Sequence, residues 1–370
     1  MTLVLALSGC GGSGNATSTP TPTPTPTTFT FDASEMITNL TNDIIVSGYI
    51  ELNTQAVQLQ EKVLNLMLAP TQANLIATQE GWKAARKPWE QGEAHIFGPI
   101  DALSIDPHLD SWPLNTNDLI AVLDNSAGFS ADLVRLWNDD IQGFHTMEFL
   151  LFGDGVNDNV KDIEQFTAQE LEYLVALSEV FAGYTLDLEN AWIVSNNNGD
   201  AYKDTLISAD NDFYSSQTAV IEELINGMIG IVDEVGAGKI ADPFGASIDS
   251  VDTSKVESQY SWNSLTDFTD NIKGVLNVYQ GEKEGQTDKQ GLYDFVAAGD
   301  AALATRVQTE IETAIAAVEA IAGDNNMPFR QALSDADGRV RIEAAVAALL
   351  VLQTSLTDEV LPLLNDWDAS

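Results

Sequence analysis

The spacing of apolar residues constrains this chain most, because they recur every three or four positions over long stretches. In residues 34–70 the apolar positions include Ile37, Leu40, Ile44, Leu52, Leu59, Val63 and Leu66. The same period recurs in residues 167–194, 217–235, 300–322 and 339–364. Strand-like alternation is nearly absent, so the spacing predicts an all-α chain. Long helices joined by short polar turns favour antiparallel bundles.

Capping residues mark the starts of two of these helices. Asp32 or Ser34 is the expected N-cap of the first helix, which should run to Pro70. Thr167 and Glu170 have the spacing of a capping box, in which each residue satisfies a backbone amide of the other. We therefore expect the helix over 167–194 to begin at this pair.

The polar, turn-rich stretch 194–212 is the expected seam between two helical-bundle halves. On this interpretation residues 33–200 form an N-terminal half and residues 201–370 form a C-terminal half. A long loop within one body would have the same composition. The chain has no repeat of fixed short period, so a solenoid is not expected.

The N-terminus resembles a bacterial lipoprotein signal. Residues 1–10, "MTLVLALSGC", end on Cys10, the single cysteine of the chain, which excludes internal disulfides and cysteine-based metal sites. Residues 11–32 are rich in Gly, Ser, Thr and Pro and are expected to form an extended tether. We expect a lipid on Cys10 to anchor the chain to a membrane. The segment lacks a basic residue and its apolar run is short, which indicates a truncated start.

The charge of the chain limits its partners. With 56 acidic and 16 basic residues, the formal net charge is −40. Such an acidic protein repels polyanions, so nucleic acid is not an expected partner. Metal ions and other cations would be attracted.

The stretch "QGFHTMEFLLFG" contains the first candidate for chemistry. His145 and Glu148 are three residues apart, and in a helix this spacing places both side chains on one face. The flanking residues are strongly apolar, and a charge buried there must be paired or coordinated. The pair can therefore bind a metal, or it can be a polar contact between helices.

A second candidate lies in "GWKAARKPWEQGEAHIFGP". Glu90 and Glu93 form another pair of carboxylates three residues apart, and they are either a solvated face or metal ligands. Trp82 and Trp89 are expected in the core. Pro88 is expected to strain or kink the helix there.

The pattern around His145 excludes one metallopeptidase class. A zincin needs His-Glu-x-x-His, and no second histidine follows His145. Any metal site would combine one histidine with carboxylates, with His95 as a further candidate. Oxygen-rich coordination without thiols suits iron or manganese better than structural zinc.

Taken together, these stretches resemble the imelysin family over about residues 35–365. Its Gly-x-His-x-x-Glu signature is read here as Gly143, His145 and Glu148, followed by "FLLFG". The block "WKAARKPWEQGEAHIFGPID" is similar to the family's upstream block. The stretches "GKIADPFG" and "ESQYSWNSLTDFTDNIKGVLNVYQG" are similar to its C-terminal blocks.

This resemblance implies an all-helical body of two bundle-like halves, exported to the bacterial cell envelope and facing the periplasm or the outer membrane. The signature would lie in a cleft between helices, and the family is associated with iron uptake, so iron-uptake proteins are expected partners. The family is also classed with metallopeptidases. Hydrolysis needs fixed ligands, an open position and a base, and the motif supplies two ligands and no base, so binding is the favoured interpretation.

The sequence thus leads to one hypothesis and two alternatives. The hypothesis is a cleft that binds a metal ion, iron first and zinc second, through His145, Glu148, Glu93 and Glu90. The expected cleft-lining residues are Gly143, Arg86, Trp89, Asp110, Trp262 and Asp267. The alternatives are a metallopeptidase, and a structural or ligand-binding lipoprotein in which His145 and Glu148 only hydrogen-bond.

Overall fold

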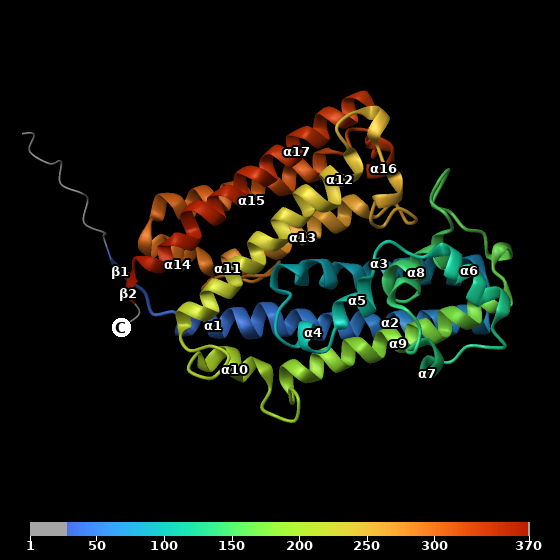
Figure 1. The fold of residues 1–370 in the computed structure, drawn as a ribbon, viewed down its shortest axis with the longest axis horizontal. Coiled ribbons are helices and arrows are strands. Elements are labelled where there is room, and N and C mark those ends of the chain that lie inside the picture. The colour runs from blue at the N-terminus through green and yellow to red at the C-terminus, as the bar shows by residue number, and fades with distance from the viewer. Residues whose placement is uncertain (1–27, 369–370) are drawn as a thin grey trace, which may run out of the picture.

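The computed structural model describes residues 28–368 and is built almost wholly of helices (Figure 1). The helices of its first part are α1 (Ser34–Asn39), α2 (Ser47–Leu68), α3 (Gln72–Gly92), α4 (Pro99–Ala102), α5 (Ile105–Asp110), α6 (Thr116–Asn125), α7 (Ala131–Val134), α8 (Gly143–Phe152) and α9 (Ala168–Ile193). Those of its second part are α10 (Tyr202–Ser208), α11 (Gln217–Asp233), α12 (Asp242–Phe244), α13 (Ser264–Gln280), α14 (Leu292–Gly299), α15 (Ala301–Ala320), α16 (Phe329–Ala332) and α17 (Ala336–Ser355). The predicted all-α class is confirmed.

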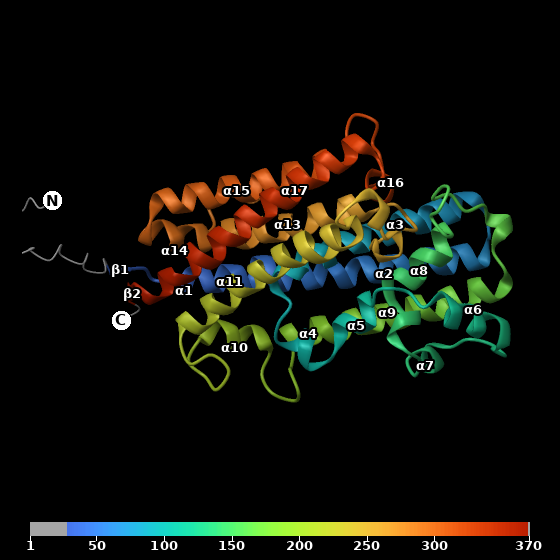
Figure 2. The ribbon, with the colours of Figure 1, turned by 45° about the horizontal axis from the view of Figure 1, so that its top comes forward.

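Long helices form two groups that lie side by side (Figures 1 and 2). In one group α2 packs between α3 and α9, and the short helices α4 to α8 lie along these helices. In the other group α11, α13, α15 and α17 pack on one another. The groups join mainly where α13 lies against α3 and α11 lies against the turn Glu93–His95. Two packed bundles are therefore observed, as expected.

The ends of the described chain meet at one end of the molecule (Figure 1). Strand β1 (Phe29–Thr30) pairs in parallel with β2 (Trp367–Asp368). Phe29 and Phe31 also pack against the ring of Phe295. The last residues of the predicted tether are therefore part of the folded body, because their aromatic side chains find apolar contacts there.

Local sequence explains how several helices begin. The Thr167 hydroxyl accepts from the Glu170 amide at 3.1 Å, and the Glu170 carboxylate accepts from the Thr167 amide at 2.7 Å. The predicted capping box is thus confirmed. At the first helix the N-cap is Ala33, between the two expected positions, so that prediction is wrong by one residue; the Asp32 carboxylate accepts from the Ser34 amide at 3.1 Å.

Three predicted helices contain π-helical segments, which periodicity alone does not reveal. The segments are Leu40–Val46, Glu234–Ala241 and Leu356–Val360, which extend the helices next to them. Such wide turns are rare and often occur at functional sites. The second segment carries Lys239 to the interface between the two groups of helices.

A glycine allows the two groups to approach closely. At Gly274 in α13 a Cβ atom would lie 2.2 Å from the carbonyl oxygen of Gln91 in α3, so any larger residue would push the helices apart. This contact brings Asn271, one turn earlier in α13, against Glu90 and Glu93. The interface is therefore tight where the candidate site lies.

Some predictions about the chain's organisation stay predictions. The signal over 1–10, Cys10 and the tether up to residue 27 lie outside the described residues. The division at residue 200 is likewise untested. Helix α10, just after that position, packs on α9, α1 and the segment Leu40–Val46.

Candidate functional site

Gly143 sets the position of the helix that carries His145. Its φ is +67°, and a Cβ atom there would lie 2.2 Å from the carbonyl oxygen of Leu109. Only glycine fits this conformation and this contact. The N-terminus of α8 therefore rests on the end of α5, which places His145 beside Asp110. Gly143 shapes the packing, and its backbone faces α5.

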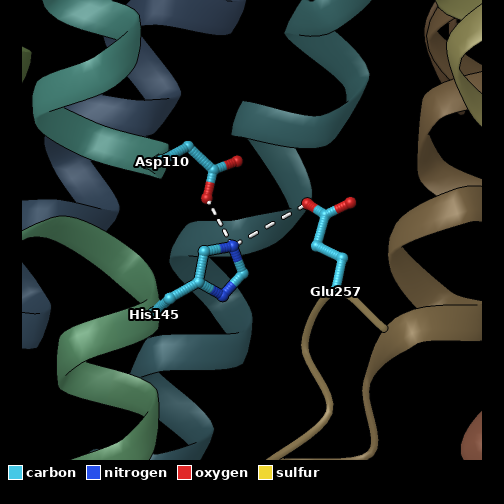
Figure 3. A group of neighbouring side chains, drawn as sticks. All are labelled: Asp110, His145 and Glu257. Atoms are coloured by element: carbon cyan, nitrogen blue, oxygen red, sulfur yellow. Dashed lines mark ion pairs between the residues drawn. The ribbon is translucent and has the colours of Figure 1, made fainter. Parts of the chain in front are cut away.

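The imidazole of His145 is buried and has a different partner on each nitrogen. Nδ1 lies 3.0 Å from Glu148 Oε2. Nε2 lies 3.0 Å from Asp110 Oδ1 and 3.9 Å from Glu257 Oε1, as the dashed lines in Figure 3 show. The ring of Trp112 packs against the imidazole at 4.6 Å. His145 thus connects two separate groups of acidic residues.

Its neighbours favour the charged form of this histidine. Burial alone would lower the pKa of His145, but the charge of Asp110 and hydrogen bonds to Asp110 and Glu148 raise that pKa to about 9. Burial would raise the pKa of Asp110, but Arg86 and His145 hold it well below its usual range. The pair is therefore an ion pair at neutral pH.

Both carboxylate oxygens of Glu148 have hydrogen-bonding partners within the protein. Its Oε1 accepts three hydrogen bonds, from the amides of Tyr260 and Ser261 at 3.0 and 2.7 Å and from the Ser261 hydroxyl at 2.7 Å. Its Oε2 faces His145. Glu148 therefore ties α8 to the loop before α13 and orients the imidazole, as carboxylates behind metal-binding histidines commonly do.

Arg86 is a buried cation surrounded by acids. Its guanidinium contacts Glu90 closely and lies 2.5 Å from Asp110, 2.9 Å from Glu257 and 3.3 Å from Asp267. These carboxylates come from α3, α5, the loop before α13 and α13 itself. Because a planar guanidinium presents several donors at once, Arg86 can hold all four elements together.

Lys239 is a second buried cation, and it comes from the π-helical segment. Its Nζ lies 2.8 Å from Glu93 Oε2, 3.1 Å from Glu257 Oε2 and 3.5 Å from Glu90 Oε2. Asn271 donates to Glu90 and to Glu93, at 2.6 Å in both cases. Both groups of helices therefore contribute to one acidic cluster.

Acids outnumber bases in this cluster. Three basic side chains, Arg86, Lys239 and His145, face six buried carboxylates: Glu90, Glu93, Asp110, Glu148, Glu257 and Asp267. Burial raises the pKa of Glu93 to about 8 although Lys239 opposes the shift, and burial raises the pKa of Asp267 to about 6. The cluster thus holds more carboxylates than its own cations can neutralise.

A cavity of about 650 Å³ opens beside this cluster. Glu93, Asp110, Lys239 and Glu257 line its inner wall, and its lining also includes Asp106, Trp112, Glu234, Asp242 and Lys255. Burial and the charge of Asp110 raise the pKa of Asp106 to about 6. The cavity exceeds the roughly 30 Å³ that one water occupies in the liquid, so it has room for an ion with its own ligands.

The described side chains offer two sets of donors that fit a metal ion. Asp110, His145 and Glu257 form one set, and Glu90, Glu93 and Asp110 form the other. Within each set, one donor atom from every residue lies within 4.8 Å of the others. One imidazole with several carboxylates suits iron or manganese, as the sequence suggested.

The structure brings together most of the residues singled out from the sequence. Glu90, Glu93, His145, Arg86, Asp110 and Asp267 meet in the cluster, and Trp89 joins them by donating from Nε1 to Asp110 Oδ2 at 2.5 Å. Trp82 and Trp89 are buried, as expected. Helix α3 continues through Pro88.

Of the residues expected to line the cleft, only Asp110 lines the cavity, whereas Gly143, Arg86, Trp89 and Asp267 pack around the cluster without lining it. Trp262 and His95 lie outside the cluster. Trp262 is only half-buried and donates from Nε1 to the Gly155 carbonyl at 2.8 Å, so it packs on the loop after α8 and does not line the cavity. The backbone of Trp262 is left-handed, with a φ of +62°, and its side chain lies toward Gly155. His95 lies 3.3 Å from the Tyr49 hydroxyl and belongs to neither donor set, because the chain turns at Glu93–His95.

Sequence reasoning missed Glu257 and Lys239. Both occur in stretches that resemble C-terminal family blocks, but Glu257 precedes α13 in a segment without periodicity. Lys239 lies in a helical segment with apolar residues, and in such a pattern a single lysine is predicted to be exposed to solvent. A buried charge opposite carboxylates from another helix gives no signal in one sequence.

Comparison with known proteins gives a consistent result. The family model described as imelysin matches residues 45–356. Iron-regulated protein A of Synechococcus elongatus is 27% identical over 334 residues, which cover 90% of this chain and 87% of that protein. A structure from Parabacteroides distasonis, assigned as an iron-regulated protein A precursor, is 29% identical with a TM-score of 0.77, covering 89% of this chain and 93% of that one. An imelysin-like protein from Psychrobacter arcticum shares the fold, with 14% identity, a TM-score of 0.70 and coverage of 91% and 98%.

Proposed function

The chain belongs to the imelysin family, and from that premise we propose that it binds a metal ion, iron in the first place, in the cavity beside His145. The excess of carboxylates on the inner wall of this cavity carries the proposal. Buried like charges repel one another at low effective dielectric, and a bound cation would relieve that repulsion.

Each side chain has a role in this proposal. Asp110, Glu257 and the Nε2 atom of His145 hold the ion, and Glu93 and Glu90 provide the neighbouring carboxylates. Glu148 orients His145 instead of serving as a ligand, because its Oε1 already accepts three hydrogen bonds and its Oε2 contacts Nδ1. When bound, the ion supplies positive charge to this cluster.

The cellular setting is part of the proposal. A relative 29% identical is assigned as an iron-regulated protein A precursor, and the N-terminal segment of this chain resembles a lipoprotein signal. We infer that the chain is exported, carries a lipid on Cys10 and takes part in iron uptake at the cell envelope, with iron-uptake proteins as partners. Zinc is the second candidate ion.

Calorimetric titration tests the binding site directly. Iron(II) under anaerobic conditions, and zinc(II) separately, would be titrated into the wild-type protein and into Glu257→Gln, which removes one charge from the cavity wall. The matched control is Glu284→Gln, because Glu284 is fully exposed beside Lys87. We expect Glu257→Gln to weaken iron binding by roughly 100-fold, and the control to leave it unchanged.

Two outcomes would contradict the proposal. Equal affinity in the wild type and Glu257→Gln would place any metal elsewhere. No binding in the wild type would leave the cluster as an internal salt-bridge network, in which Arg86, Lys239 and His145 are the counter-ions.

A further inference from the structure

The two buried cations of the cluster differ in their freedom to move. Arg86 is sealed among four carboxylates and does not line the cavity. Lys239 is only 8% exposed, yet its side chain forms part of the cavity wall. Of these two cations, Lys239 is therefore the one that can leave its position without disturbing the packing.

The ammonium of Lys239 lies where metal ligands converge. Its Nζ contacts Glu93, Glu257 and Glu90 at 2.8, 3.1 and 3.5 Å. Glu90 and Glu93 belong to one donor set, and Glu257 belongs to the other. An ion held by either set would share at least one carboxylate with this ammonium.

The cavity offers Lys239 room and other partners. Glu234 and Asp242 line the same cavity, and both are exposed to solvent. A lysine carries a compact charge on a flexible stem, so the ammonium can turn from the inner carboxylates toward these outer ones. The π-helical segment Glu234–Ala241 holds the backbone of Lys239 beside both the inner and the outer carboxylates.

We propose that Lys239 is a tethered cation that occupies the acidic cluster in the absence of metal and is displaced toward Glu234 and Asp242 when a multivalent ion enters. This inference rests on the proposed function. Its consequence is selection by charge: replacing one ammonium by a monovalent ion gains nothing, whereas a divalent or trivalent ion adds positive charge among the carboxylates.

Removal of the ammonium tests the inference. Manganese(II) would be titrated into the wild type, Lys239→Gln and Lys289→Gln. Lys289 is exposed, pairs with Asp43 at 2.8 Å and does not line the cavity, so its substitution measures the general effect of losing one positive charge. We expect Lys239→Gln to bind manganese about tenfold more tightly or better, in line with couplings between close buried charges, and Lys289→Gln to change affinity far less.

Thermal unfolding gives a second readout. Without metal, Lys239→Gln should melt at a lower temperature than the wild type, because three carboxylates lose their counter-ion. Manganese should then raise its melting temperature more than it raises that of the wild type. Should Lys239→Gln fail to fold, Lys239→Arg keeps the charge, and its forked guanidinium should release the carboxylates less readily and weaken metal binding.

The outcomes separate the two proposals. Wild-type binding with unchanged or weaker affinity in Lys239→Gln overturns the displacement and leaves the proposed function intact. An affinity of Lys239→Arg equal to or above that of the wild type also overturns it. Binding by Lys239→Gln alone supports the role of Lys239 and contradicts metal binding by the wild type, and binding by neither contradicts both.

Discussion

The two sides of the His145 imidazole differ in how their charge is satisfied. On the Nδ1 side, Glu148 meets two backbone amides and one hydroxyl, all of them neutral donors in fixed positions. On the Nε2 side, the imidazole faces Asp110 and Glu257 (Figure 3). These two acids belong to a cluster with more acids than bases and with a cavity beside it. The carboxylate on the Nδ1 side is therefore fully hydrogen-bonded within the protein. The acids on the Nε2 side exceed their counter-ions and can accommodate another cation.

This difference shows that the two charged residues of one short motif can serve separate purposes. Glu148 joins α8 to a loop 113 positions away and fixes the imidazole. His145 presents its Nε2 edge to the acids of α5 and of the loop before α13. The glutamate therefore contributes mainly to the framework, and the histidine contributes to the proposed site.

The largest expected effect is on the Nδ1 side. Glu148→Ala should lower the free energy of unfolding by about 3–5 kcal/mol, because it leaves the Nδ1 side of a buried imidazolium and three further donors without their acceptor. Glu257→Ala should change the free energy of unfolding by less than about 1 kcal/mol, because the cluster has more acids than bases and loses only one of them. Urea denaturation of the metal-free proteins measures both. Equal losses in the two variants would abolish the proposed distinction between the sides.

The helices and the general position of the site could be predicted from the sequence. Periodicity identified α2, α9, α11, α15 and α17, and the capping box at Thr167 fixed the start of α9. The spacing of His145 and Glu148 correctly implied neighbouring side chains on one helix. Periodicity works here because each of these helices buries one face along its length.

The division of roles within the cluster could not be predicted. Which residue of the motif faces the acidic cluster depends on the loop that carries Ser261, and no local rule places that loop against α8. Glu257 and Lys239 meet Arg86 and Glu93 only through tertiary packing. Trp262 was expected in the cleft, but its left-handed backbone turns it toward Gly155.

The pH dependence of metal binding is the next expected effect. Metal binding requires neutral His145 and ionised Glu93, whose pKa values are raised to about 9 and about 8. Protons must therefore be released, and affinity should rise by up to about tenfold per pH unit for each proton between pH 6.5 and 9. Titrations across this range measure it. Affinity that is flat or falls with pH would show that neither group takes part.

The stability of the metal-free protein should change in the opposite direction. Both folded-state pKa values lie above their unfolded values of 6.5 and 4.5, so each group's contribution is present at low pH. The stabilising contribution of His145 is lost as pH rises from 6.5 through about 9. The contribution of Glu93 is lost as pH rises from 4.5 through about 8. Melting temperatures should therefore fall over this range, and less steeply in Glu93→Gln.

The smallest expected effect concerns one donor on the Nδ1 side. Ser261→Ala removes the hydroxyl bond to Glu148 but keeps both amide bonds. It should cost about 1 kcal/mol of unfolding free energy and leave metal affinity unchanged. Calorimetric titration and urea denaturation of the same preparation check both values. A large loss of affinity would indicate that Glu148 acts on the ion directly.

Anomalous diffraction from crystals soaked in iron(II) or manganese(II) locates a bound ion directly. We expect a single strong peak between Asp110, Glu257 and the Nε2 atom of His145, with Glu148 still bound to Ser261. A peak beside Glu148 on the Nδ1 side, or the absence of any peak in the cavity, would contradict the assignment of the two sides of His145.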